Sequence, residues 1–180
     1  MQILIQGLGI IVLIICVSAF FFKKKEYFLA CILLYNIILA VQYVLLSYYT
    51  EFIICILAII KDIVYYVYSK KQLKPSVFVL IIFITLFVLS GIFTWENWFS
   101  IFIMFSTVIG TYASWQDNLF VLRLGYVLCS IFLILNYIFT GLYTNIIAEF
   151  LTLSSGLISI YIYHIKKNTR DKNFNSDKIN

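Results

Sequence analysis

Long apolar runs separated by short polar breaks make up most of the sequence. The breaks include "KKKE" at 23–26 and "KKQLKP" at 70–75. Each run is long enough to cross a hydrocarbon core of roughly 30 Å as a helix that rises 1.5 Å per residue. The pattern therefore predicts seven transmembrane helices, at residues 2–22, 27–48, 52–69, 76–93, 98–115, 119–140 and 143–164.

The composition agrees with an all-α, multi-pass membrane protein. Hydrophobic residues make up 63% of the chain and charged residues 12%, too few to cover a water-facing surface. The first apolar run has no basic region before it and no small-residue cleavage site after it, so we expect a retained span and not a signal peptide. The predicted spans occupy most of the chain, so we expect no soluble domain beside them. The polar segment begins at residue 166, and we expect residues 168–180 to be disordered.

Basic residues predict the orientation of the chain. Cytoplasmic loops of membrane proteins collect Lys and Arg, and eleven of the thirteen basic residues fall on one side of the predicted membrane. The N-terminus is therefore expected outside and the C-terminus in the cytoplasm. The net charge of +5 then indicates contact with anionic lipids at the cytoplasmic face, and not nucleic-acid binding. The eleven residues are Lys23, Lys24, Lys25, Lys70, Lys71, Lys74, Lys166, Lys167, Arg170, Lys172 and Lys178.

Two stretches of the chain resemble each other. "LYNIILAVQYVLLSYYT" at 34–50 and "LCSIFLILNYIFTGLYT" at 128–144 share six of seventeen residues at an offset of 94. The same offset aligns Gln42 with Asn136, and the first span with the fifth. We predict two three-helix repeats, 1–69 and 98–167, joined by a linker at 70–97 that contains the fourth span. The extra crossing makes the repeats parallel, an arrangement in which carriers bind substrate between the halves.

Polar residues inside the predicted spans are the candidates for a substrate site. An unpaired charge in hydrocarbon costs several kcal/mol, so such residues are expected to face the bundle interior or a watery cavity. For each of them the alternative is an interhelical hydrogen bond that only fixes packing. The candidate substrate-binding residues are Asn36, Gln42, Lys61, Asp62, Asn136, Glu149 and Ser155.

Lys61 and Asp62 cannot pair with each other by helix geometry alone, because adjacent residues point about 100° apart. Each is therefore expected to need another partner. Glu149 in the seventh span lies at a similar depth to Lys61, so we predict that the two charges face the cleft between the repeats and interact. Arg123 lies near the cytoplasmic end of its span, where its guanidinium can reach the interface.

Other chemistry is not indicated. The four cysteines lie within spans without metal-like spacing and are expected to be small buried residues. Neither a phosphate loop, a zinc motif nor a Ser-His-Asp arrangement is present, so the sequence predicts no cofactor, no metal and no enzymatic activity. The cysteines are Cys16, Cys31, Cys55 and Cys129.

Four stretches resemble the YgjV family of bacterial inner-membrane proteins. These are "QGLGIIVLIICVSAFFFKKKEYFL", "LLYNIILAVQYVLL", "AIIKDIVYYVYSKK" and "TYASWQDNLFVLRL…ILNYIFTGLYTNIIAEFLTLSSGLISIYIY". The family is similar, more distantly, to SWEET and PQ-loop proteins and to PnuC-type carriers. The chain departs from these patterns because it has no Pro-Gln pair and its one proline, Pro75, lies in a loop. It also has Lys61 and Asp62 where YgjV relatives typically have an arginine and an asparagine.

The resemblance and the repeat together imply a facilitator or secondary carrier of a small polar solute, sugar-like or nucleoside-like. It would alternate access between the two repeats in the bacterial inner membrane. A receptor or accessory protein that does not transport is the alternative on the same scaffold. An oligomer is possible on this scaffold.

Overall fold

The computed structural model describes residues 2–93, 98–140 and 143–165, and within them the chain forms helices without strands. Each run predicted as a span overlaps one α-helix. The "TWEN" break, the break at 141–142 and the tail from residue 166 lie outside the described residues. The helices are α1 (Gln2–Ala19), α2 (Lys25–Leu45), α3 (Tyr49–Lys70), α4 (Val77–Phe93), α5 (Ser100–Trp115), α6 (Leu119–Thr140), α7 (Tyr143–Ile160) and a final π-helical turn, η1 (Tyr161–Ile165).

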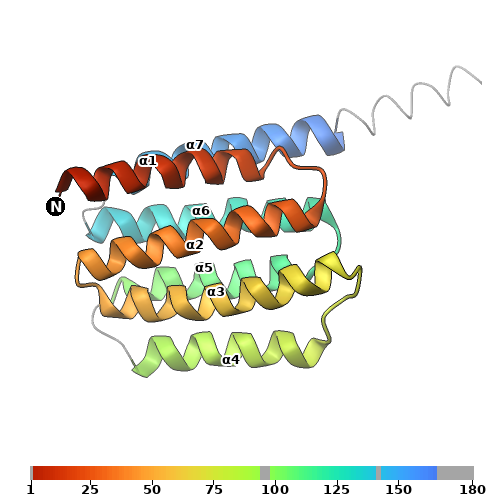
Figure 1. Cartoon of the computed structure of the whole chain (residues 1–180), viewed down its shortest axis with the longest axis horizontal. Helices are drawn as coiled ribbons and strands as arrows, with labels where there is room; N and C mark the ends of the chain where they lie inside the picture. The colour runs from red at the N-terminus through yellow and green to blue at the C-terminus, as the bar shows by residue number, and fades with distance from the viewer. Residues whose placement is uncertain (1, 94–97, 141–142, 166–180) are drawn as a thin grey trace, which may run out of the picture.

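The helices form two rows (Figure 1). One row consists of α1, α2 and α3, and the other of α7, α6 and α5, with α4 at one edge. Neighbours within each row pack against each other, α1 packs on α7, α3 packs on α5, and α4 packs on both α3 and α5. The bundle is therefore a closed ring of helices in which α2 and α6 occupy the middle of opposite rows.

The ends of the bundle differ in charge. The connections from α1 to α2, from α3 to α4 and from α5 to α6 lie at the same end, where α7 also finishes (Figure 1). The first two of these connections contain Lys23, Lys24, Lys71 and Lys74. The start of α1 lies at the opposite end (Figure 1).

Apolar side chains cover much of the outer surface. The exposed positions include Ile60 on α3, Phe78 on α4 and Ile147 on α7, a distribution typical of a helix bundle that is solvated by lipid. By length and composition, α2, α3, α6 and the segment Tyr143–Tyr163 can each cross a membrane. The apolar segments Gly7–Ala19, Val77–Phe93 and Ser100–Trp115 are shorter.

The first helix ends earlier than its apolar run predicts, at Ala19 instead of residue 22. The chain then turns, and side chains from the other row bind carbonyl oxygens of this turn. Ser159 Oγ donates to the Phe20 carbonyl at 2.6 Å, and Arg123 Nη2 donates to the Phe22 carbonyl at 2.8 Å. Carbonyl groups beyond a helix end need such partners where water is scarce.

Close packing between α1, α6 and α7 depends on Gly156. A methyl group at this position would lie 2.5 Å from Val127 Cγ2 and 3.0 Å from Phe20 Cε1. Small residues allow membrane helices to approach closely. Gly7 on α1 is different, because a methyl group there would meet no atom within 4 Å.

We therefore predict that Gly156→Ala lowers the stability of the bundle by about 1–3 kcal/mol, the usual cost of overpacking. Gly7→Ala is the matched control and should leave stability unchanged or raise it slightly, because alanine is the better helix former. Thermal unfolding of the purified protein in detergent measures both. Equal midpoints for the two variants would contradict the packing described here.

Candidate functional site

A cavity of about 80 Å³ lies between the two rows of helices. Apart from Phe20, which follows α1, its described lining residues come from α1, α2, α3, α5, α6 and α7, and none of them comes from α4. The lining is mainly apolar, with polar groups from both rows. Those polar groups include Asn36, Lys61 and Glu149, three of the residues predicted from the sequence.

The lining residues are distributed in pairs along the chain. Eight pairs of them are separated by 94 positions, the offset that aligns the two similar stretches. Equivalent positions of the aligned segments therefore contribute to the same cavity. Examples are Asn36 with Ser130, Tyr43 with Tyr137, and Cys55 with Glu149.

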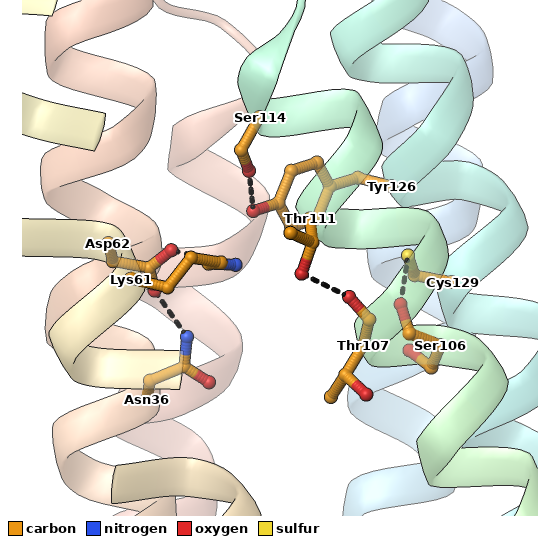
Figure 2. Close-up of polar contacts among 9 residues, drawn as sticks. All are labelled: Asn36, Lys61, Asp62, Ser106, Thr107, Thr111, Ser114, Tyr126 and Cys129. Atoms are coloured by element: carbon orange, nitrogen blue, oxygen red, sulfur yellow. Dashed lines mark hydrogen bonds and ion pairs between the residues drawn. The ribbon is translucent and has the colours of Figure 1, made fainter. Parts of the chain in front are cut away.

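Lys61, which lines the cavity, forms an ion pair with Asp62, which does not line it. Lys61 Nζ lies 2.9 Å from Asp62 Oδ1, and Asn36 Nδ2 donates to Asp62 Oδ2 at 2.6 Å. Asp62 is fully buried, whereas the ammonium of Lys61 points away from α3 toward α5 and α6 (Figure 2). The expectation that these neighbours cannot pair is wrong. The flexible lysine stem lets the ammonium reach the adjacent carboxylate, although the two Cβ atoms diverge.

Glu149 is buried on the opposite wall, in α7. The Tyr35 hydroxyl donates to Glu149 Oε1 at 2.9 Å, and the Ser130 hydroxyl interacts with the same carboxyl group. Lys61 and Glu149 both line the cavity, as predicted, but the ion pair expected between them is not formed. Lys61 instead has its counter-ion on its own helix, so the partners of Glu149 are hydroxyl groups.

Tyrosines that the sequence reasoning did not select connect Glu149 to one end of the cavity. Tyr137 interacts with Tyr35, and Tyr43 Oη lies 3.4 Å from Tyr137 Oη. Tyr43 and Tyr137 are 94 positions apart, and they are among the identities of the two similar stretches. That identity could have identified them as candidate site residues. Tyrosine is also common at membrane interfaces, however, so the identity alone did not point to the cavity.

Four predicted residues do not line the cavity, and Asp62, the partner of Lys61, is one of them. The Asn136 amide donates to the Phe99 carbonyl at 3.3 Å, and Ser155 donates to the Thr152 carbonyl within α7. Gln42 is buried in α2, close to Gly9 of α1. These contacts match the packing role that was the alternative for such residues.

Arg123 binds protein groups near the basic end of the bundle. Its side chain is buried, with 1% of the residue exposed, and lies over the Tyr163 ring at 4.8 Å. The guanidinium donates to the Phe22 carbonyl, next to Lys23 in the connection from α1 to α2. This connection lies at the basic end of the bundle (Figure 1), the end toward which the side chain was expected to extend.

Polar contacts join segments of the two rows near the basic end. Lys25 at the start of α2 pairs with Asp117, in the turn between α5 and α6, at 3.3 Å. Asp117 is largely exposed, so this ion pair is expected to be weak. Within the α5–α6 row, Ser114 and Tyr126 hydroxyls lie 2.8 Å apart (Figure 2).

The buried ion pair leads to a stability prediction. Lys61→Met or Asp62→Asn alone leaves a buried group without its counterpart and should cost about 3–5 kcal/mol. The double variant should cost clearly less than the sum of the two. Thermal unfolding in detergent of the unmodified protein, the two single variants and the double variant measures these costs as a double-mutant cycle. The Lys25 and Asp117 pair is the control and should show coupling below about 1 kcal/mol. Additive costs at Lys61 and Asp62 would contradict the ion pair.

Comparison with known proteins gives one match. No curated protein and no solved structure matches the chain. Among protein families, Imp-YgjV, described as bacterial inner membrane protein, matches residues 3–167. The match includes all six helices that line the cavity. The chain therefore belongs to the Imp-YgjV family of bacterial inner membrane proteins.

Proposed function

We propose that this protein carries a small polar solute, sugar-like or nucleoside-like, across the bacterial inner membrane by alternating access. The cavity between the helix rows carries this proposal, because equivalent positions of the two rows line it together. A pore or cleft between parallel halves is where carriers of this architecture bind substrate. Asn36, Lys61 and Glu149 offer both donors and acceptors to a hydroxylated solute.

The same proposal includes seven membrane crossings with the basic end in the cytoplasm. It is supported by the Lys-containing connections, which gather at one end of the bundle (Figure 1). It is also supported by the opposite positions of the start of α1 and the end of α7 (Figure 1), since an odd number of crossings separates the two ends. The shorter helices cross by tilting little or by local thinning of the bilayer.

We further propose that the rows are two parallel repeats related by an axis along the membrane normal. Rotation about this axis would exchange α1 with α5, α2 with α6 and α3 with α7. Packing supports it, because the rotation would also exchange the α3–α5 contact with the α1–α7 contact. Tyr43 and Tyr137 touch each other, as equivalent residues do when they lie beside a two-fold axis.

The size of the cavity supports a carrier that must open. Sites for drug-sized ligands measure about 300–1,000 Å³, whereas this cavity has about 80 Å³. That space holds a few water molecules but not a sugar or a nucleoside. Binding therefore requires the rows to separate, which is the motion that alternating access uses.

The orientation leads to a prediction. Reporter fusions after Lys25, Lys74 and Lys167 should report the cytoplasm, and fusions near Glu51 and Glu96 should report the exterior, because of the distribution of basic residues. Activity of paired periplasmic and cytoplasmic reporters measures this. A cytoplasmic signal at Glu51 would remove both the seven crossings and the parallel repeats.

Transport is tested with purified protein in lipid vesicles and a panel of labelled monosaccharides and nucleosides. Protein-dependent uptake of at least one solute is expected. Asn36→Ala should lower that uptake about tenfold, as expected for one lost hydrogen bond of roughly 1.4 kcal/mol. Ser154→Ala is the control, because this side chain is exposed on the outside of α7, and it should leave uptake unchanged.

A carrier differs from a receptor in that the two ends of its cavity change accessibility in opposite senses when solute is added. In a cysteine-free background, Tyr137→Cys and Tyr126→Cys place single thiols at opposite ends of the cavity lining on α6. With a carrier, adding the transported solute should raise the maleimide reactivity of one thiol and lower that of the other. Binding of a panel solute without flux and without this reciprocity would favour the receptor.

A further inference from the structure

We infer that Glu149 is a proton-binding site, which is neutral in the closed cavity and releases its proton when the cavity opens to water. This inference rests on the proposed function in one respect, because it makes the carrier proton-coupled. The binding of the proton itself does not depend on the identity of the solute. The site consists of the Glu149 carboxyl and the hydroxyl groups of Tyr35 and Ser130.

The first argument is the balance of charge in the cavity. Lys61 is neutralised by Asp62 at 2.9 Å, and Asn36 binds the second oxygen of the same carboxylate. Glu149 is 3% exposed, and its described partners are Tyr35 and Ser130, which carry no charge. A carboxylate buried without a cation pays a large desolvation cost, and such groups usually bind a proton instead.

The groups that face Glu149 from neighbouring helices do not change this balance. They lie on α1, α2 and α6, and each of them is a thiol or a phenol, neutral near pH 7 when buried. Lys61 on α3, the one cation among the described lining residues, is already paired. The facing groups are Cys16, Tyr35, Cys129 and Tyr137.

The second argument is a path for the proton. Tyr43, Tyr137 and Tyr35 form a series of hydroxyl groups that ends at Glu149. Tyr43 lies two residues before the end of α2, at the end of the bundle that faces the exterior in the proposed orientation. Tyr43 is buried, so a hydronium ion can pass its proton along the hydroxyls only when water reaches this end of α2. An O–H bond then forms at Glu149, and a water molecule remains outside.

The step from Tyr43 to Tyr137 is the point of control. Their oxygens are 3.4 Å apart, longer than the usual 2.7–2.8 Å of a hydroxyl hydrogen bond. The contact also joins α2 to α6, and therefore one row to the other. Separation of the rows at this end would break the series and admit water, which hydrates the carboxylate and favours loss of the proton.

Infrared difference spectroscopy of the full chain in lipid, between neutral and alkaline buffer, tests the site without any solute. We expect the carbonyl-stretch band of a protonated carboxyl group at neutral pH. Glu149→Gln should remove this band. Glu51→Gln, which changes another buried glutamate outside the cavity lining, should retain it. Tyr35→Phe should shift the band to higher frequency, because the carbonyl oxygen loses its donor.

Absence of the band from the unmodified protein at neutral pH would overturn the inference, and so would a band that persists in Glu149→Gln. If Glu149→Gln does not fold, an unshifted band in Tyr35→Phe would overturn it as well.

Coupling is measured in vesicles with an inward proton gradient, where Glu149→Gln should reduce uptake to the level without a gradient. If uptake by the unmodified protein does not depend on the proton gradient, the proposed coupling is wrong, and the proposal that the protein is a carrier still holds. If the carboxyl band behaves as expected but no panel solute is taken up, the proposal of a carrier is contradicted, and the proton-binding site is not.

Discussion

Polar side chains within this apolar bundle need partners from the protein, and this requirement determines much of its structure. Lipid tails offer no hydrogen bonds, so polar groups at membrane depth are stabilised by bonding to another helix or to their own backbone, or by facing a cavity. Ser159 and Arg123 bind the carbonyls that follow α1. Asn136 binds the carbonyl that precedes α5. Polar residues thus fix the ends of other helices, across the rows for Ser159 and Arg123 and within one row for Asn136, while apolar residues fill the space between the helices.

Two buried acidic groups meet this requirement in different ways. Asp62 has a cation and an amide as partners, whereas Glu149, which lines the cavity, has hydroxyls. Cys55, which lines the cavity 94 positions before Glu149, has no acidic group. In the proposed carrier, a solute would therefore meet different charges on its two sides.

The helices could be predicted from the sequence because hydropathy and length decide them. The runs 76–93 and 119–140 match α4 and α6 within one residue at each end. The end of α1 could not be predicted, since it depends on donors from α6 and α7, more than 100 positions away. The site was predicted in part. Burial of polar residues follows from their cost in lipid, but the partner of Lys61 depends on how its flexible side chain folds.

Two weak contacts join the rows near opposite ends of α2. At one end, Tyr43 and Tyr137 are joined by a long contact of 3.4 Å. At the other, Lys25 and Asp117 form an ion pair with an exposed carboxylate, of the kind worth about 0–1 kcal/mol. Within each row the contacts combine apolar packing with buried hydrogen bonds, such as that of Asn36 to Asp62, and opening there would expose close-packed surfaces. Separation of the rows at one end would break one of the two weak contacts, and at the basic end also the hydrogen bonds of Arg123 and Ser159, but it would leave each row intact, as the proposed alternating access requires.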